Sequence, residues 1–196
     1  MAQITDHITA HLERSAAIKM ATATQCSAAA AAAAEMIAAS LKAGGKLMLC
    51  GNGGSAGDAQ HIAAEFVATL DHSMPRPGLA AIALTTDTSF ITAYSNDFGF
   101  AGIFARQVEA LGRDGDVLIG ISTSGNSGNV VAALETAREN GIGTIALTGT
   151  GGGSMAAVAD ILIDVPSSTT ALVQESHIAL GHAITAGVET LLGYRK

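Results

Sequence analysis

Short apolar runs recur along the chain and are bounded by Gly, Ser, Asp or Pro. Each run is rich in Leu, Ile or Val, and nearly every position within it is apolar. A pattern of this kind predicts strands that are buried on both faces of a sheet. The predicted strands are Lys46–Gly51, Leu79–Thr85, Val117–Ser122, Thr144–Gly149 and Ile161–Pro166.

The segments between these runs carry apolar residues at helical spacing, which predicts helices over Ala56–Leu70, Ile103–Leu111 and Asn129–Asn140. A long helix or helix pair is predicted over Ile4–Ala43, closed by two glycines, and a final helix over Thr170–Leu192. Strands that alternate with helices indicate an α/β fold: a five-stranded parallel sheet flanked by helices on both faces. No linker, charge run or repeat divides the chain, so residues 1–196 are expected to form a single domain.

Small polar residues follow three of the predicted strands, in the sequences GNGGS, TTDTS and STSGNS. In open parallel sheets, ligands bind at the carboxyl ends of the strands. The three polar strand ends therefore predict one ligand-binding edge.

The STSGNS sequence stands between a predicted strand and a predicted helix. Hydroxyl groups and free backbone amides at a helix N-terminus bind phosphate without Lys or Arg, because the helix dipole favours an anion there. An ordinary N-cap would use only one hydroxyl. A phosphate site is therefore favoured, formed by Ser122, Thr123, Ser124 and Ser127.

The glycines of GNGGSA fit the loose G-x-G-x-x-G/A dinucleotide fingerprint, at Gly51, Gly53 and Ala56. That fingerprint also needs an acidic residue at the end of the next strand, whereas Asp71 precedes that strand. A second substrate-binding loop fits better than a dinucleotide site, and a tight turn with positive φ is the simpler alternative. The residues of this loop are Asn52, Gly53, Gly54 and Ser55.

His61 and Glu65 are four residues apart, so they share one face of the helix that follows the glycine loop. They could hold a metal, act as a base beside it, or form a simple surface pair. Gln174 and His182 similarly lie on nearly one face of the last helix. If the two helices pack together, these side chains offer two nitrogens and two oxygens, a donor set that suits zinc or a similar divalent ion.

Two further groups leave a structural and a functional interpretation open. His177 and His182, inside an otherwise apolar helix, could each be a core histidine with a satisfied hydrogen bond. Asn96 and Asp97 offer an amide and a carboxylate for sugar hydroxyls, or they form an Asx turn before Phe98.

Composition and charge narrow the class of protein. The net charge of −7 argues against nucleic acid or an anionic membrane as a partner. The alanine run Ala28–Ala34 is too short to span a bilayer, and we see no signal peptide at the N-terminus. Cys26 and Cys50 have no CxxC spacing, which favours reduced thiols in a cytoplasmic protein.

The assembled motifs resemble the phosphoheptose isomerases, which belong to the sugar isomerase (SIS) domain group. The resemblance runs from about Ala43 to the C-terminus, through GNGGSAGDAQHIAAEF, TTDTS, SNDFGF, GDVLIGISTSGNS, LTGTGGG and QESHIALGH. The HxxxE and QExHxxxxH sequences are its most specific parts. The resemblance implies a Rossmann-like or flavodoxin-like three-layer SIS fold, and a homotetramer with helices of residues 1–43 packed between subunits.

The resemblance also assigns roles to individual residues. It implies one zinc ion per subunit, bound by His61, Glu65, Gln174 and His182. It implies that the serine and threonine loop holds the phosphate of a seven-carbon sugar, and that Asn52, Gly53 and Gly54, with Asn96 and Asp97, line the sugar. Glu65 is the candidate base and His182 the candidate acid for an enediol mechanism, while Gln174 and Ser55 border the substrate. Ala171 stands where some members have an aspartate.

Three alternatives remain at this point. One is a non-catalytic SIS tetramer that binds a replication initiator or senses a sugar phosphate, although those relatives lack the glutamate and the last histidine. Another is an SIS isomerase that acts on hexose, pentose or amino-sugar phosphates. A dinucleotide-dependent oxidoreductase is the third, and it lacks its acidic partner.

Overall fold

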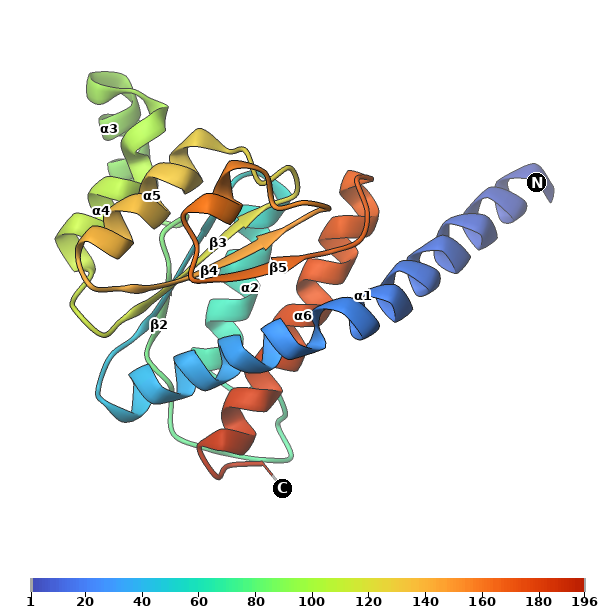
Figure 1. Cartoon of the computed structure of the whole chain (residues 1–196), viewed down its shortest axis with the longest axis horizontal. Helices are drawn as coiled ribbons and strands as arrows, with labels where there is room; N and C mark the ends of the chain where they lie inside the picture. The colour runs from blue at the N-terminus through green and yellow to red at the C-terminus, as the bar shows by residue number, and fades with distance from the viewer. Residues whose placement is uncertain (1, 196) are drawn as a thin grey trace.

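The computed structural model describes residues 2–195 and forms a three-layer α/β sandwich (Figure 1). Its sheet is parallel throughout, with the strand order β2-β1-β3-β4-β5. The strands are β1 (Leu47–Gly51), β2 (Ala81–Ala83), β3 (Val117–Ser122), β4 (Gly143–Thr148) and β5 (Ile161–Asp164). The predicted fold class and all five predicted strands are confirmed. β2 is shorter than predicted because it lies at the edge and pairs with β1 alone.

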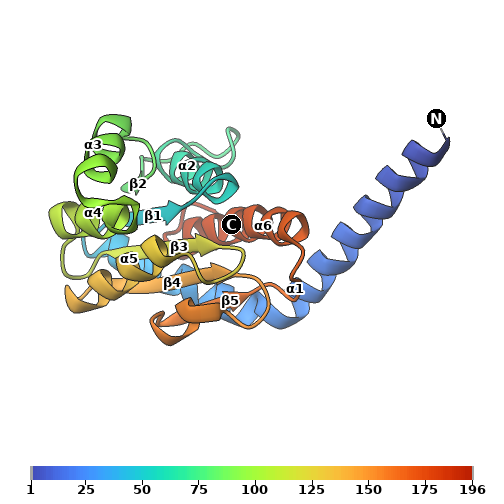
Figure 2. The ribbon, with the colours of Figure 1, turned by 90° about the horizontal axis from the view of Figure 1, so that it is seen from above.

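Alternate residues of the central strands enter two separate cores. On one face, Leu47, Leu49 and Ile119 pack with α1 (Ala2–Lys42), α2 (Gly54–Val67) and α6 (Thr170–Leu191). On the other face, Met48 and Leu118 pack with α4 (Ile103–Leu111) and α5 (Gly128–Glu139). The helices on the two faces are seen from above in Figure 2. This two-sided burial is why the strands read as continuous apolar runs.

Helix α1 is a single helix of 41 residues, not a pair. At 1.5 Å per residue, it is about 60 Å long. Its C-terminal half packs on the body of the molecule, and its N-terminal end projects away from it (Figures 1 and 2). Residues 2–14 are here called the arm, and His11 near its base contacts Glu175 of α6, with 2.7 Å between His11 Nε2 and Glu175 Oε1. Among residues 2–195, no helix has both the length and the apolar character that crossing a membrane requires.

The sequence predicts only a helical turn after TTDTS, where the structure has the 11-residue helix α3 (Thr88–Phe98). This helix begins at the TTDTS sequence, where the Asp87 side chain caps it by accepting a hydrogen bond from Phe90 N at 3.0 Å. Two short 3₁₀ helices complete the fold, η1 (Phe100–Gly102) and η2 (Gly153–Ala157). Both cysteines are buried and free, and burial raises the pKa of the Cys50 thiol to about 12.

Candidate active site

Helices α2 and α6 lie side by side, and glycines mark their closest contacts. A Cβ added at Gly54 would lie 2.4 Å from Gln174 Nε2, and one added at Gly181 would lie 2.6 Å from Ile62 Cδ1. The contact of Gly54 with Gln174 lies near the start of both helices. The contact of Ile62 with Gly181 lies about two turns further along each helix. The helices therefore run in the same direction, which brings the HxxxE face of α2 opposite the middle of α6.

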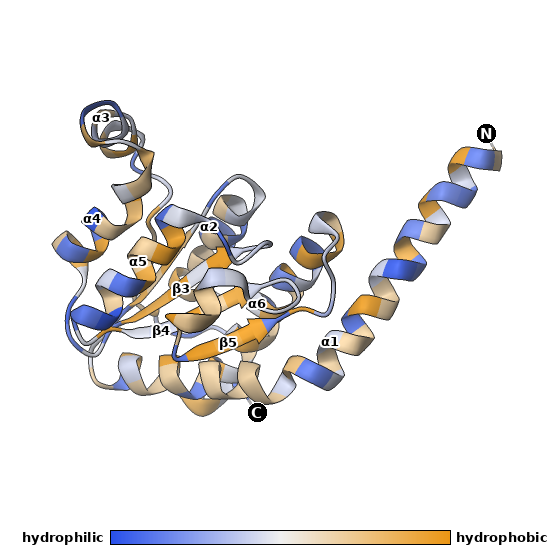
Figure 3. Cartoon of the chain, turned by 45° about the horizontal axis from the view of Figure 1, so that its top comes forward, coloured by the Kyte–Doolittle hydropathy of each residue, from blue (hydrophilic) through white to orange (hydrophobic). Residues whose placement is uncertain are grey.

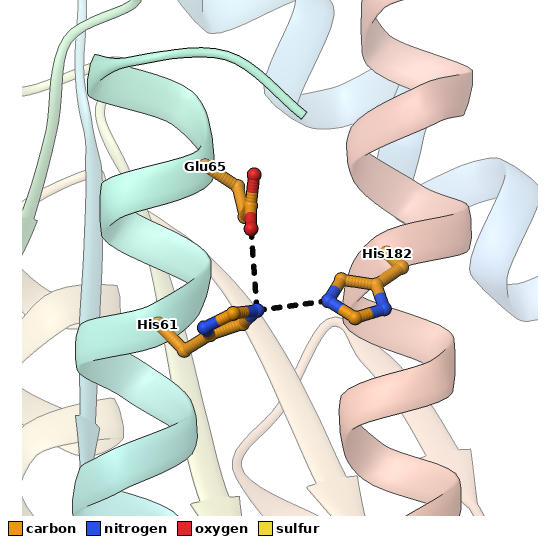
Figure 4. A group of neighbouring side chains, drawn as sticks. All are labelled: His61, Glu65 and His182. Atoms are coloured by element: carbon orange, nitrogen blue, oxygen red, sulfur yellow. Dashed lines mark hydrogen bonds and ion pairs between the residues drawn. The ribbon is translucent and has the colours of Figure 1, made fainter. Parts of the chain in front are cut away.

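His61, Glu65 and His182 converge between the two helices (Figure 4). His61 Nε2 lies 2.9 Å from His182 Nε2 and 3.2 Å from Glu65 Oε1. The His61 side chain is half-exposed, whereas 19% of the Glu65 side chain is accessible. Residues from segments more than a hundred positions apart in sequence are therefore brought to one point at the edge of the body.

This cluster has the donors and the spacing that a divalent metal requires. One ligand atom from each of the three residues lies within 4.8 Å of the others. Zinc bonds of 2.0–2.2 Å at tetrahedral angles place neighbouring donors about 3.3–3.6 Å apart, which is slightly longer than the 2.9 and 3.2 Å from His61 Nε2 to its two neighbours. His61 Nε2 faces both Glu65 Oε1 and His182 Nε2, and a neutral His61 can donate a single Nε2 proton to only one of them. A bound cation would satisfy all three donors together.

Gln174 lies on the same helix as His182 but nearer its start. Its side-chain amide rests against Gly54, at the first residue of α2. It thereby connects the glycine loop to α6. Ser55, in the first turn of α2, is buried at 4% exposure.

The serine and threonine loop has the geometry of an anion site rather than of a simple helix cap. Ser127 immediately precedes α5, yet its side chain makes no capping hydrogen bond. Its hydroxyl instead lies 2.9 Å from Ser122 Oγ, which is 3.4 Å from Ser124 Oγ. The helix N-terminus thus stays available to a ligand, while Gly125 allows the turn with a φ of 65°. Thr123 is half-buried between these serines.

Two amide side chains to which the sequence analysis assigned no role, those of Asn129 and Asn126, hold the two loops in place. Asn129 and Asn52 exchange two hydrogen bonds, of 2.8 and 2.9 Å, so the glycine loop is tied to the start of α5. Asn126 donates to Ser124 O and accepts from both the backbone and the hydroxyl of Ser154. Their position in polar segments after the strands was the signal in the sequence that could have indicated a role. Their partners could not be predicted, because these lie in other segments of the chain.

Asn96 and Asp97 lie in the last turn of α3 and are exposed. Asn96 Nδ2 donates to Asp97 Oδ1 at 2.8 Å. Helix α3 packs on the α4 and α5 face of the sheet through Ile91 and Tyr94. Within one chain, this pair is therefore separate from the His61 cluster.

Two titratable groups near the cluster differ in character. His177 is fully buried and donates from Nε2 to Thr148 O at 3.0 Å, and burial lowers its pKa to about 4. It is the core histidine of the structural interpretation. Asp58, one turn before His61, has a buried Oδ2 that makes no hydrogen bond to any residue of the described range 2–195. Burial raises the pKa of Asp58, while His61 acts in the opposite direction. Its place on the HxxxE face was a signal that the sequence analysis did not use.

The fold and the two polar loops define a class of phosphosugar-binding domain, and the SIS domain family matches residues 10–149. The chain is 56% identical over 168 residues to a phosphoheptose isomerase from Rhodospirillum rubrum, covering 85% of this chain and 88% of the relative.

Solved structures agree with this likeness. A phosphoheptose isomerase from Neisseria gonorrhoeae superposes with a TM-score of 0.89 and 46% identity, over 95% of this chain and 99% of that one. A phosphoheptose isomerase from Francisella tularensis superposes with a TM-score of 0.90 and 40% identity, over 95% of this chain and 98% of that one. The chain belongs to the phosphoheptose isomerase family.

Proposed function

We propose that this chain is an aldose–ketose isomerase that converts sedoheptulose 7-phosphate to D-glycero-D-manno-heptose 7-phosphate. The observation that carries the proposal is the convergence of His61, Glu65 and His182 in a member of this family. It places a carboxylate and an imidazole, the groups that acid–base catalysis uses most often, at one point.

In this reaction the open-chain ketose loses a proton from C1 and gains one at O2, which gives an enediol. Glu65 is the base that removes the C1 proton, and His182 is the acid that protonates the oxygen. Glu65 then delivers the proton to C2, while O1 gives its proton to the deprotonated His182, which forms the aldehyde and restores the acid. Each positioned acid or base contributes about 10²–10⁴-fold to the rate.

The two loops would bind the rest of the substrate. Hydroxyls of the Ser122–Ser127 loop and the free amides of α5 hold the phosphate, and the glycine loop borders the sugar. The Asn52–Asn129 pair keeps these loops at a fixed separation, which suits a substrate whose reacting carbons and phosphate are several bonds apart. Asn96 and Asp97 are separate from the His61 cluster within one chain, so in this proposal they complete the sugar site of a neighbouring copy in the tetramer.

Zinc would be held by His61, Glu65 and His182, with Gln174 as the fourth donor. When bound, zinc polarises a carbonyl and stabilises the negative charge that develops on oxygen. Glu65 has two carboxylate oxygens, so one of them can remain free to act as the base. A histidine that is bound to zinc is a poor acid, so the proposal includes exchangeable ligation of zinc by His182. Apart from these two contacts, with Glu65 and His182, the His61 side chain makes no hydrogen bond or ion pair within the described residues, so we assign it a ligating role alone.

The regulatory alternative is not favoured, because Glu65 and His182 are both present and face the same point. The product would supply heptose for cell-surface glycans, and we place the reaction in the cytoplasm, where the two free cysteines stay reduced.

A homotetramer is also part of the proposal. The arm exposes Ile4, Ile8 and Leu12 at fractions of 66%, 53% and 62%. A groove of about 380 Å³ between α1 and α6 is lined by small residues such as Ala30 and Gly187. Small residues let helices approach closely, so these surfaces suit packing between copies of the chain.

The test is to incubate the purified protein with sedoheptulose 7-phosphate and follow the formation of aldoheptose phosphate. Fructose 6-phosphate and ribulose 5-phosphate serve as matched sugars of other lengths. Faster turnover of the seven-carbon sugar than of either shorter sugar supports the proposal. A preference for a shorter sugar would assign the chain to another SIS isomerase activity.

Metal dependence is tested in the same assay. Prolonged treatment with EDTA is expected to abolish turnover, and added zinc is expected to restore it. Turnover that persists after metal analysis has shown complete removal of zinc would contradict the zinc proposal and leave the isomerase proposal standing.

A further inference from the structure

Arg76 joins the two helices that carry the candidate catalytic residues. It lies in the loop between α2 and β2, and its side chain is 1% exposed. Arg76 Nε donates to Glu189 Oε1 at 2.7 Å, and the Glu189 side chain is 4% exposed. Glu189 lies on α6 about two turns after His182, on nearly the same face of the helix.

The remaining guanidinium nitrogens of Arg76 bind the C-terminus of α2. Nη2 donates to the carbonyl oxygen of Glu65 at 2.7 Å, and Nη1 donates to that of Phe66 at 2.9 Å. The last carbonyls of a helix have no partner within the helix, and a cation there also interacts favourably with the helix dipole. One side chain therefore bonds the backbone of Glu65 itself and the helix that carries His182.

Both members of the pair make further hydrogen bonds. The second oxygen of Glu189 accepts from Arg195 Nε at 3.4 Å, and Arg76 Nη1 also donates to Pro77 O at 3.0 Å. A buried ion pair of this kind adds little net stability over apolar residues of similar size. What it does supply is geometry, because the planar fork of Arg fixes several acceptors relative to one another.

We propose that Arg76 is a positioning residue for the isomerisation, with Glu189 as its anchor. It holds the backbone of Glu65 at a fixed separation from α6 and so sets how the Glu65 carboxylate meets His182 and His61. This inference rests on the proposed function of that cluster. A displacement of about 1 Å in such a cluster can cost about 100-fold in rate.

The test uses the double variant Arg76→Met/Glu189→Leu, which removes both charges and leaves neither buried alone. We expect a folded protein whose kcat falls by about 10–100-fold, with KM changed much less because the phosphate loop lies on β3 and α5. Its zinc affinity, measured by competition with a chromogenic chelator, should also fall. Arg76→Lys keeps the charge without the fork and should be intermediate in both measurements.

The matched control is Arg106→Met/Glu109→Leu, which removes an ion pair whose side chains are 54% and 48% exposed. We expect its kcat and zinc affinity to equal those of the wild type. A folded Arg76/Glu189 double variant with wild-type kcat and zinc affinity would overturn the proposal. If that double variant does not fold, the isosteric variant Glu189→Gln is measured in its place. A wild-type kcat and zinc affinity in Glu189→Gln would also overturn the proposal.

The outcomes separate this inference from the proposed function. Wild-type protein that does not turn over sedoheptulose 7-phosphate contradicts the proposed function, and the zinc competition then still tests the geometry of the cluster. Active wild type together with unaltered variants contradicts the role of Arg76 alone.

Discussion

At the scale of single residues, two histidines of one helix show how position decides chemistry. His177 and His182 are five residues apart, so they point to different sides of α6. The His177 side chain lies in the core, where its Nε2 donates a hydrogen bond to the backbone carbonyl oxygen of Thr148. His182 instead meets His61 at the edge of the body. The first is suited to structure and the second to ligation or proton transfer.

Glu65→Gln tests the proposed base. The substitution keeps the shape of the side chain but removes the group that accepts a proton from C1. Turnover of sedoheptulose 7-phosphate should fall by at least about 10²-fold. The circular dichroism spectrum and thermal midpoint should change little, because the side chain is not fully buried. A folded variant with near-normal kcat would remove Glu65 from the chemistry.

His177 predicts a pH dependence of stability. Its pKa is about 4 in the folded protein and about 6.5 when unfolded, so the unfolded chain binds more protons between these values. Stability should therefore fall as the pH decreases from about 6.5 to about 4, by roughly 3 kcal/mol from this group. Urea unfolding across this range measures it. His177→Gln should show a shallower dependence, and an equal slope in both proteins would refute the assignment.

At the scale of elements, the active site depends on the close packing of α2 on α6. Gly181 allows this approach, since an added Cβ would meet Ile62. Both helices carry their functional residues on the packed side, and the direction of packing decides which residues meet.

Gly181→Ala should separate the two helices. Overpacking of this kind costs about 1–3 kcal/mol in the free energy of unfolding, and the shift should also lower kcat. Gly57→Ala is the control, because nothing lies within 4 Å of its added Cβ. That variant should gain about 0.5–1 kcal/mol, as expected for Gly to Ala within a helix. Urea unfolding and the turnover assay distinguish the two, and equal behaviour would contradict the packing argument.

The sequence predicted most of this framework, since doubly buried strands and amphipathic helices leave clear local patterns. It predicted only one turn of α3, whose start depends on one capping contact of Asp87, and it did not reveal the true length of β2, which is limited by its edge position. The sequence did predict that His61 and Glu65 share one face of a helix, because they are four residues apart. Their meeting with His182, and the Asn52–Asn129 pair, depend on packing between distant segments, which no local pattern contains.

At the scale of the whole molecule, the most conspicuous feature is the arm. Apolar and polar turns alternate along it as it leaves the body (Figure 3). Each of its exposed apolar side chains would contribute about 1.5–3 kcal/mol if it were fully buried. Together with the groove beside it, the arm suits an assembly larger than one chain.

Ile8→Lys should weaken that assembly, because it places a charge in the apolar stripe of the arm. His7→Lys, at the neighbouring exposed position, is the control and should leave the assembly unchanged. Light scattering coupled to size-exclusion chromatography measures the mass of each. A tetramer for wild type and the control, with a smaller species for Ile8→Lys, is expected. Identical masses for all three would exclude the arm from the interface.

The most direct measurement of the central claim follows zinc-loaded wild-type protein and Glu65→Gln with sedoheptulose 7-phosphate in D₂O by NMR. The proton that Glu65 takes from C1 should exchange with D₂O before Glu65 delivers it to C2. The wild type should therefore form aldoheptose 7-phosphate with deuterium at C2, and Glu65→Gln should form almost no product. If the folded, zinc-loaded wild type forms no aldoheptose phosphate, the chain is not the isomerase proposed.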